Sequence, residues 1–240
     1  MAWLSPEEWD ALSLSAKVAL CSTAVCLPFG VALSWLLERR NFAGKVWIDT
    51  LVQLPMVLPP VVPGYLLLLL FGTQGPLGGW LQDTFGIVVA FTWKGAVLAS
   101  AVMAFPLMVQ SIRLAFRLID PRLEKAAMTL GARPWSVFFS VTLPLAVPGL
   151  IAGCVLCFSR SLGEFGATMA FVGNIPGETR TLPLAIYSLT HVPDGDAAAM
   201  RLSLLSIALA VAALLLSRWI SLRAERKLGY LDHRSQHAEL

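Results

Sequence analysis

The sequence has few charged residues and none of the motifs that mark an enzyme. Asp, Glu, Lys and Arg make up 14% of its 240 residues, against about 25% in a typical soluble domain. No Gly-x-x-x-x-Gly-Lys-[Ser/Thr] phosphate loop occurs, so the chain has no recognisable nucleotide site. Paired carboxylates and a Ser-His-Asp pattern are also missing. We therefore expect no enzymatic activity, no cofactor and no nucleic-acid partner.

Histidines and cysteines are also few, and their spacing favours packing over metal or redox chemistry. Cys154 and Cys157 form a C-x-x-C pair, but no second Cys or His pair lies near them. All four cysteines lie in apolar runs, where a thiol behaves as a small hydrophobic group. Two of the three histidines, His233 and His237, lie in the polar tail. The sequence therefore predicts no metal site.

Long apolar runs are abundant. Hydrophobic residues make up 57% of the chain, and the mean hydropathy is +0.71. A helix needs about 20 mostly apolar residues to cross the hydrocarbon core of a bilayer. Five runs fit this requirement, at about residues 18–37, 50–71, 87–112, 145–172 and 202–220. The sequence predicts one all-α domain, a polytopic membrane helical bundle with about five transmembrane helices.

Lysine and arginine are distributed unevenly between the expected loops. Cytoplasmic loops of membrane proteins are enriched in these residues. If the N-terminus lies outside, the outer side and the spans together hold Lys17, Lys94, Arg160, Arg180 and Arg201. The inner side then holds the larger set: Arg39, Arg40, Lys45, Arg113, Arg117, Arg122, Lys125, Arg133, Arg218, Arg223, Arg226, Lys227 and Arg234. We expect the N-terminus outside, with the segment 113–143 and the tail 221–240 in the cytoplasm.

The expected cytoplasmic segment contains clear helix signals. Asp120 is suited to cap a helix that begins at Pro121, Gly131 is suited to end it, and Pro134 can start another. By helical spacing Glu124, Ala127, Met128 and Gly131 share one face. The small side chains on that face would let the backbone of another protein come close. A helix that merely joins two spans explains the same pattern.

The segment also resembles a known motif. Ala126, Ala127 and Gly131, followed by Val141-x-Leu143-Pro144, are similar to the Glu-Ala-Ala coupling loop of ATP-binding-cassette import permeases. The resemblance implies a type I importer transmembrane domain whose loop docks onto a separate ATPase subunit. It assigns the ATPase-coupling role to Glu124, Lys125, Ala126, Ala127, Gly131, Ala132 and Trp135. The position of the family's glutamate is taken here by Lys125, so whether Glu124 replaces that glutamate stays open.

Several further stretches resemble the molybdate permeases of that superfamily. They are Pro28-Phe29-Gly30, residues 54–65, 127–132, 160–168 and 174–181. The resemblance implies import of molybdate across the inner membrane by a permease homodimer. Two cytoplasmic ATPase subunits would bind the ATP, and an oxyanion-binding protein would deliver substrate to the outer loops around 73–85 and 174–195. Sulfate permeases share part of the pattern, so sulfate, thiosulfate and tungstate remain alternatives.

One pair of ionisable residues falls within an expected span. Arg160 and Glu164 are four residues apart and can pair on a helix. Charged side chains at membrane depth usually face a partner or a cavity. A structural ion pair explains them, and so does an Arg160 that offers positive potential to a passing dianion. An ion-coupled secondary transporter is a less favoured alternative, because it predicts acidic residues in several spans and Glu164 is the one clear case.

The second expected span is rich in proline. Pro55, Pro59, Pro60 and Pro63 each lack the backbone donor of a helix, and Gly64 follows them. Broken helices persist in lipid where protein or a water-filled cavity satisfies the freed carbonyls. We expect this span to line the transport pathway or the dimer seam, with Pro59, Pro60, Pro63 and Gly64 as gate candidates. A purely structural kink is an equal alternative.

Overall fold

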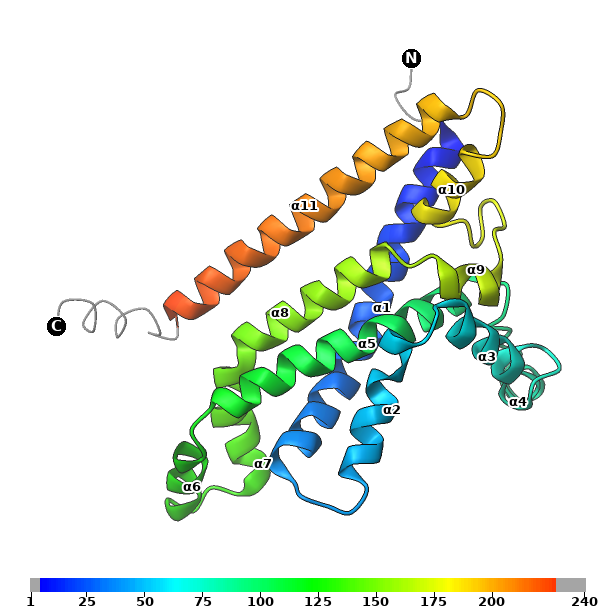
Figure 1. Cartoon of the computed structure of the whole chain (residues 1–240). Helices are drawn as coiled ribbons and strands as arrows, with labels where there is room; N and C mark the ends of the chain where they lie inside the picture. Colours follow the sequence, from blue (N-terminus) through cyan, green and yellow to red (C-terminus); the bar gives the residue numbers. More distant parts are fainter. Residues whose placement is uncertain (1–4, 228–240) are drawn as a thin grey trace.

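The structure is a computed structural model, and it describes residues 5–227, in which all regular secondary structure is helical. Figure 1 shows the arrangement. His233, His237 and the end of the expected tail 221–240 lie outside the described residues. The helices are α1 (Pro6–Arg39), α2 (Lys45–Val57), α3 (Val61–Phe71), α4 (Pro76–Phe85), α5 (Trp93–Leu118), α6 (Pro121–Thr129), α7 (Pro134–Val137), the π-helical turn η1 (Phe138–Thr142), α8 (Leu143–Leu162), α9 (Gly166–Val172), α10 (Leu182–Leu189) and α11 (Asp196–Lys227).

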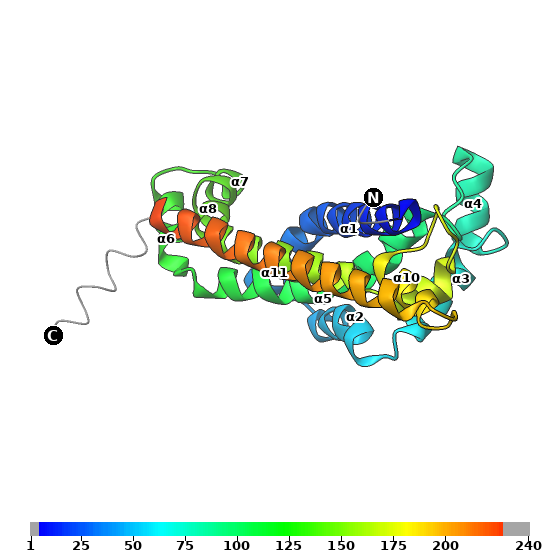
Figure 2. The ribbon, with the colours of Figure 1, turned by 90° about the horizontal axis from the view of Figure 1, so that it is seen from above.

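The helices pass back and forth between two ends of the molecule. One end carries α6 and α7 and is called the coupling end, after the role predicted for this segment. The opposite end carries α4 and α10 (Figures 1 and 2). Helices α1, α5 and α11 run toward the coupling end, whereas α2 and α8 run away from it. Within residues 5–227, four helical stretches are long and apolar enough to cross a membrane, and α2 with α3 makes a fifth if a bent pair is counted as one span. The predicted all-α membrane bundle is confirmed.

Two of the expected spans are interrupted. The span expected over 50–71 consists of α2 and α3, which are bent by 113° around Pro59 and Pro60, where the prolines predicted an interruption. Pro59 and Pro60 have no amide hydrogen to donate, so two helical hydrogen bonds are lost at this point. The stretch expected over 145–172 consists of α8 and α9, with residues 163–165 between them.

Helix α5 is the centre of the bundle, between α1 and α8. Half of its buried residues are Gly, Ala or Ser, including Ala96, Ala99 and Ala104. Small residues let membrane helices approach closely, and polar groups then bond across the seam. Ser22 Oγ donates to the Val97 carbonyl at 3.0 Å, and Ser34 Oγ donates to the Val109 carbonyl at 3.0 Å. These bonds fix the register of α1 on α5.

Helix α11 is anchored at its beginning and exposed beyond it. Leu202 packs with Ala11, Leu182 and Ala185 in a buried cluster at the opposite end. Arg201 Nη2 lies 2.6 Å from Glu8 Oε1 of α1. Farther along α11 the apolar side chains turn outward, and Ile207 is 61% exposed. Residues 204–216 of α11 therefore present an apolar surface suited to lipid or to another protein.

Candidate functional site

The segment between α5 and α8 folds as its sequence signals predicted. Asp120 Oδ1 accepts the amide of Arg122 at 2.9 Å, and Pro121 is the first residue of α6. Gly131 follows the helix with a φ of +88°, a backbone conformation that glycine adopts without strain. The amide of Ala132 bonds back to the Ala127 carbonyl at 3.2 Å. This turn orients α7, which begins at Pro134.

Large apolar side chains are exposed at this end of the molecule. Leu130 is 89% exposed and Trp135 is 72% exposed. Lys125 and Ala126 are exposed beside them. Exposed apolar groups of this size, rimmed by polar residues, are typical of protein interfaces. Of the predicted coupling residues, Lys125, Ala126, Gly131 and Trp135 are exposed, while Ala127 and Ala132 are half-buried.

Glu124 does not face outward with them. Its Oε1 lies 2.9 Å from Nη2 of Arg39 and accepts a hydrogen bond from Thr142 Oγ1 at 2.9 Å. Glu124 and Ala127 are half-buried, whereas Met128 and Gly131 are exposed. The single partner-facing surface expected for these four residues is therefore corrected, because part of it turns toward the bundle. A cavity of about 500 Å³ adjoins Glu124, between α1 and the α6–α7 segment.

The breaks in the two interrupted spans meet each other. A Cβ at Gly64 would lie 2.5 Å from the carbonyl oxygen of Ala167, and one at Gly166 would lie 2.7 Å from Cβ of Pro60. Pro63 and Gly64 are buried, whereas Pro59 and Pro60 are exposed. Glycine is therefore required at 64 because α3 approaches the backbone of α9, and at 166 because the ring of Pro60 leaves no room for a side chain. Discontinuous helices that meet in this way commonly surround transport pathways.

Arg160 and Glu164 lie at this junction and are paired. The distance between Arg160 Nη1 and Glu164 Oε2 is 2.5 Å. Glu164 Oε1 also accepts the Ala167 amide at 2.8 Å, which caps the start of α9. The side chain of Glu164 is 1% exposed and that of Arg160 is 32% exposed. The carboxylate thus has a structural role, and the accessible member of the pair is Arg160.

A second charged cluster near the coupling end was not identified from the sequence. Arg113 Nη1 of α5 lies 2.6 Å from Asp49 Oδ1 of α2. Arg117 Nε and Nη2 bond both carboxylate oxygens of Glu38 at 3.1 and 3.2 Å. Gln110 Nε2 reaches Gln53 Oε1 at 3.5 Å. The cluster ties α1, α2 and α5 together, and these partners are too far apart in the chain for spacing to reveal them.

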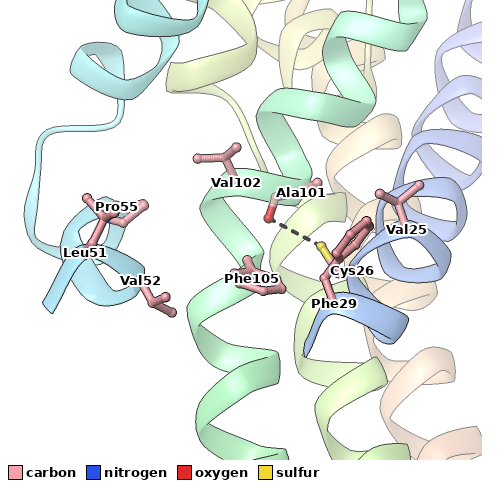
Figure 3. A pocket seen from close by; sticks show the side chains of 9 residues that line it. All are labelled: Val25, Cys26, Phe29, Leu51, Val52, Pro55, Ala101, Val102 and Phe105. Carbon is pink, nitrogen blue, oxygen red and sulfur yellow. Dashed lines mark hydrogen bonds between the residues drawn. The ribbon is translucent and has the colours of Figure 1, made fainter. Parts of the chain in front are cut away.

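The apolar pocket drawn in Figure 3 lies between the same three helices. Its cavity of about 410 Å³ is lined by Val25, Cys26, Phe29, Leu51, Val52, Pro55, Ala101, Val102 and Phe105. Cys26 Sγ donates to the Ala101 carbonyl at 3.5 Å. No charged side chain lines this cavity, so it offers nothing to hold an oxyanion. Over residues 5–227, no three His, Cys, Asp or Glu residues are grouped to hold a metal ion.

Comparison with known proteins identifies the family. Residues 27–226 match the family described as binding-protein-dependent transport system inner membrane component. The chain belongs to this family. It is 54% identical over 226 residues to the molybdenum transport system permease protein ModB of Escherichia coli K12, covering 94% of this chain and 99% of that protein. It is 39% identical over 181 residues to the sulfate transport system permease protein CysW of E. coli K12, covering 75% and 62%.

The fold agrees with this membership. A bacterial alginate ABC transporter, solved with an alginate pentasaccharide-bound periplasmic protein, has a chain that superposes with a TM-score of 0.71. The match covers 94% of this chain and 81% of that one at 19% identity. This chain is therefore a multi-pass membrane permease component of a transport system. Its exposed α6–α7 segment and the junction of its two broken spans are the candidate functional sites.

Proposed function

We propose that this protein is the membrane permease subunit of an ATP-driven molybdate importer. The observation that carries the proposal is the exposed α6–α7 segment, with its turn at Gly131, at one end of a membrane bundle. An apolar surface of this kind needs a partner protein. A separate ATPase subunit would dock there and supply the energy, since the chain has no phosphate loop of its own.

The direction of the helices supports an orientation with the N-terminus outside. Helix α1 begins at the end opposite α6 and α7, and α11 runs from that same end toward the coupling end (Figure 1). An ATPase docked on α6–α7 must lie in the cytoplasm. The start of α1 would then be outside and the C-terminal end of α11 inside, as the distribution of lysine and arginine also indicates.

The assembly that fits these features is a homodimer with two ATPase subunits and an oxyanion-binding protein outside. Helix α2 has no buried residue, and its Trp47 and Val57 are 80% and 82% exposed. Two copies facing each other would enclose a pathway that one copy leaves open. The binding protein would deliver substrate at the opposite end, around residues 73–85 and 174–195.

Molybdate is the proposed substrate because similarity to ModB is higher and more complete than similarity to CysW. Arg160, whose side chain is 32% exposed, would lie beside the pathway and attract a tetrahedral dianion. ATP-driven closure of the ATPase dimer would favour one bundle conformation over the other, which moves the binding site from outside to inside. Sulfate, thiosulfate and tungstate are the competing substrates.

Two experiments test this function. Uptake of radiolabelled molybdate by the reconstituted complex should require ATP and the binding protein, and excess sulfate should compete poorly. Gly131→Arg should abolish co-purification of the ATPase, whereas Gly44→Arg is a matched control. Gly44 has a similar φ of +92°, and neither glycine has an atom within 4 Å of an added Cβ. ATP-independent uptake, or an ATPase retained by Gly131→Arg, would contradict the proposal.

A further inference from the structure

One carboxylate links α6 to two membrane-spanning helices. Glu124 Oε1 is bonded to Arg39 Nη2 at the end of α1 and to Thr142 Oγ1, both at 2.9 Å. Thr142 is the last residue of η1, which continues directly into α8. It is 2% exposed, so its hydroxyl is enclosed by the bundle. Any displacement of Glu124 therefore acts on both α1 and α8.

Arg39 extends this link to a third helix. Its Nη2 also donates to the carbonyl of Ile119 at 3.4 Å, and Ile119 is the C-terminal cap of α5. The side chains of Arg39 and Glu124 are 15% and 14% exposed. A charge pair that is largely removed from water is screened less than a surface pair. The pair can therefore hold the ends of α1, α5 and α6 in a fixed relation.

The remainder of α6 is weakly packed. None of its residues is buried. Leu123 and Met128, its larger apolar side chains, are 49% and 45% exposed. A segment with few buried contacts can move on its own unless specific bonds hold it. Within the described residues, the bonds of Glu124 are the polar side-chain contacts that hold α6 to the spanning helices.

We propose that Glu124 is a positioning residue that passes movement of α6 to the spanning helices, and that it does not contact the ATPase. The inference rests on the proposed function, because it needs an ATPase that moves α6. Docking is then the task of the exposed side chains, including Lys125, which stands where the family's motif has glutamate. When the ATPase moves α6, the pair of Arg39 and Glu124 displaces the ends of α1, α5 and α8.

The test is Glu124→Gln in the complete complex, with molybdate uptake and ATP hydrolysis measured in the same vesicles. The ATPase should co-purify in unchanged amount and hydrolysis should continue, because the docking surface is intact. The ratio of uptake to hydrolysis should fall about tenfold, within the usual range for coupling between sites. Thr142→Val, which removes only the hydroxyl, should lower the ratio in the same direction by a smaller factor. Asp10→Asn, at an exposed carboxylate of α1, is the control and should leave the ratio unchanged.

A charge swap separates transmission from a general loss of structure. Arg39→Glu combined with Glu124→Arg should recover most of the lost ratio, because the reversed pair restores the bond. An unchanged ratio in Glu124→Gln, loss of the ATPase from that variant, or a swap without recovery would each overturn the inference. If the wild-type complex itself retains no ATPase, the proposed function fails as well. An active wild type with an unaffected Glu124→Gln removes only this inference.

Discussion

Arg113 of α5 holds Asp49 of α2 at 2.6 Å, and this is the closest polar contact between α2 and the other described helices. Helix α2 buries none of its residues. Packing alone therefore does little to hold α2 in position, and the charge-assisted hydrogen bond between Arg113 and Asp49 holds it more strongly. The contact makes the position of α2 sensitive to a single side chain.

Asp49→Asn should loosen α2 from α5. The two side chains are 31% and 16% exposed, so the pair lies between a surface and a buried ion pair. We expect a loss of about 1–2 kcal/mol in the free energy of unfolding. Thermal unfolding in detergent measures it, and accessibility of a cysteine introduced on α2 should rise. Glu7→Gln, at a 79% exposed carboxylate, should leave the melting temperature unchanged. Equal melting temperatures for both variants would show that packing holds α2.

Arg160→Gln should lose oxyanion uptake while the assembly survives. Glu164 keeps its bond to the Ala167 amide at 2.8 Å in this variant, so the start of α9 stays capped. What disappears is the accessible positive charge beside the junction of the broken spans. Uptake of radiolabelled molybdate should fall at least tenfold, the effect of losing about 1.4 kcal/mol of interaction. Size-exclusion chromatography should show an intact complex, and ATPase activity should persist. Undiminished uptake would leave Arg160 with a structural role only.

Leu130→Ala and Trp135→Ala should each weaken binding of the ATPase subunit. Large exposed side chains become buried at an interface, and aromatic residues there often contribute 2 kcal/mol or more. We expect roughly a tenfold or greater loss of affinity for Trp135→Ala, measured by titration of the ATPase subunit onto the solubilised permease. Leu20→Ala, at a 61% exposed position in the middle of α1, is the control and should bind normally. Normal affinity in both coupling variants would place the docking surface elsewhere.

The sequence predicted the local features of this fold better than the contacts between distant segments. The start of α6 follows from Asp120 and Pro121, because capping and proline geometry act within one turn. Arg113 and Asp49 are 64 residues apart. Nothing in their local sequence indicates that they meet, since that contact depends on how α2 returns along α5.

Glu124 and the break at Pro59 and Pro60 show the same limit. Helical periodicity grouped Glu124 with Ala127, but it could not say which side of α6 turns toward the bundle. The prolines predicted an interruption, because they remove amide donors. The bend of 113° was not predictable, because its direction is set by the packing of α3 on α9.

Gly64→Ala should test whether the contact of α3 with α9 is as close as the structure shows. The added methyl group would lie 2.5 Å from the carbonyl oxygen of Ala167 and 2.9 Å from Cβ of Ala170. Backbone atoms cannot move aside as a flexible side chain can, so the helices must separate. We expect a loss of about 1–3 kcal/mol in the free energy of unfolding, the usual cost of overpacking.

Gly79→Ala in α4 is the matched control for this substitution. Its nearest atom is the Thr73 carbonyl oxygen at 3.5 Å, an ordinary contact distance. Alanine also has the higher helix propensity, so this variant should gain up to about 1 kcal/mol. The melting temperatures of the two variants should therefore shift in opposite directions, and molybdate uptake should fall in Gly64→Ala. If Gly64→Ala matches the wild type in both measurements, α3 and α9 do not touch through their backbones. The broken spans would then meet less closely, and the junction beside Arg160 would lose its fixed geometry.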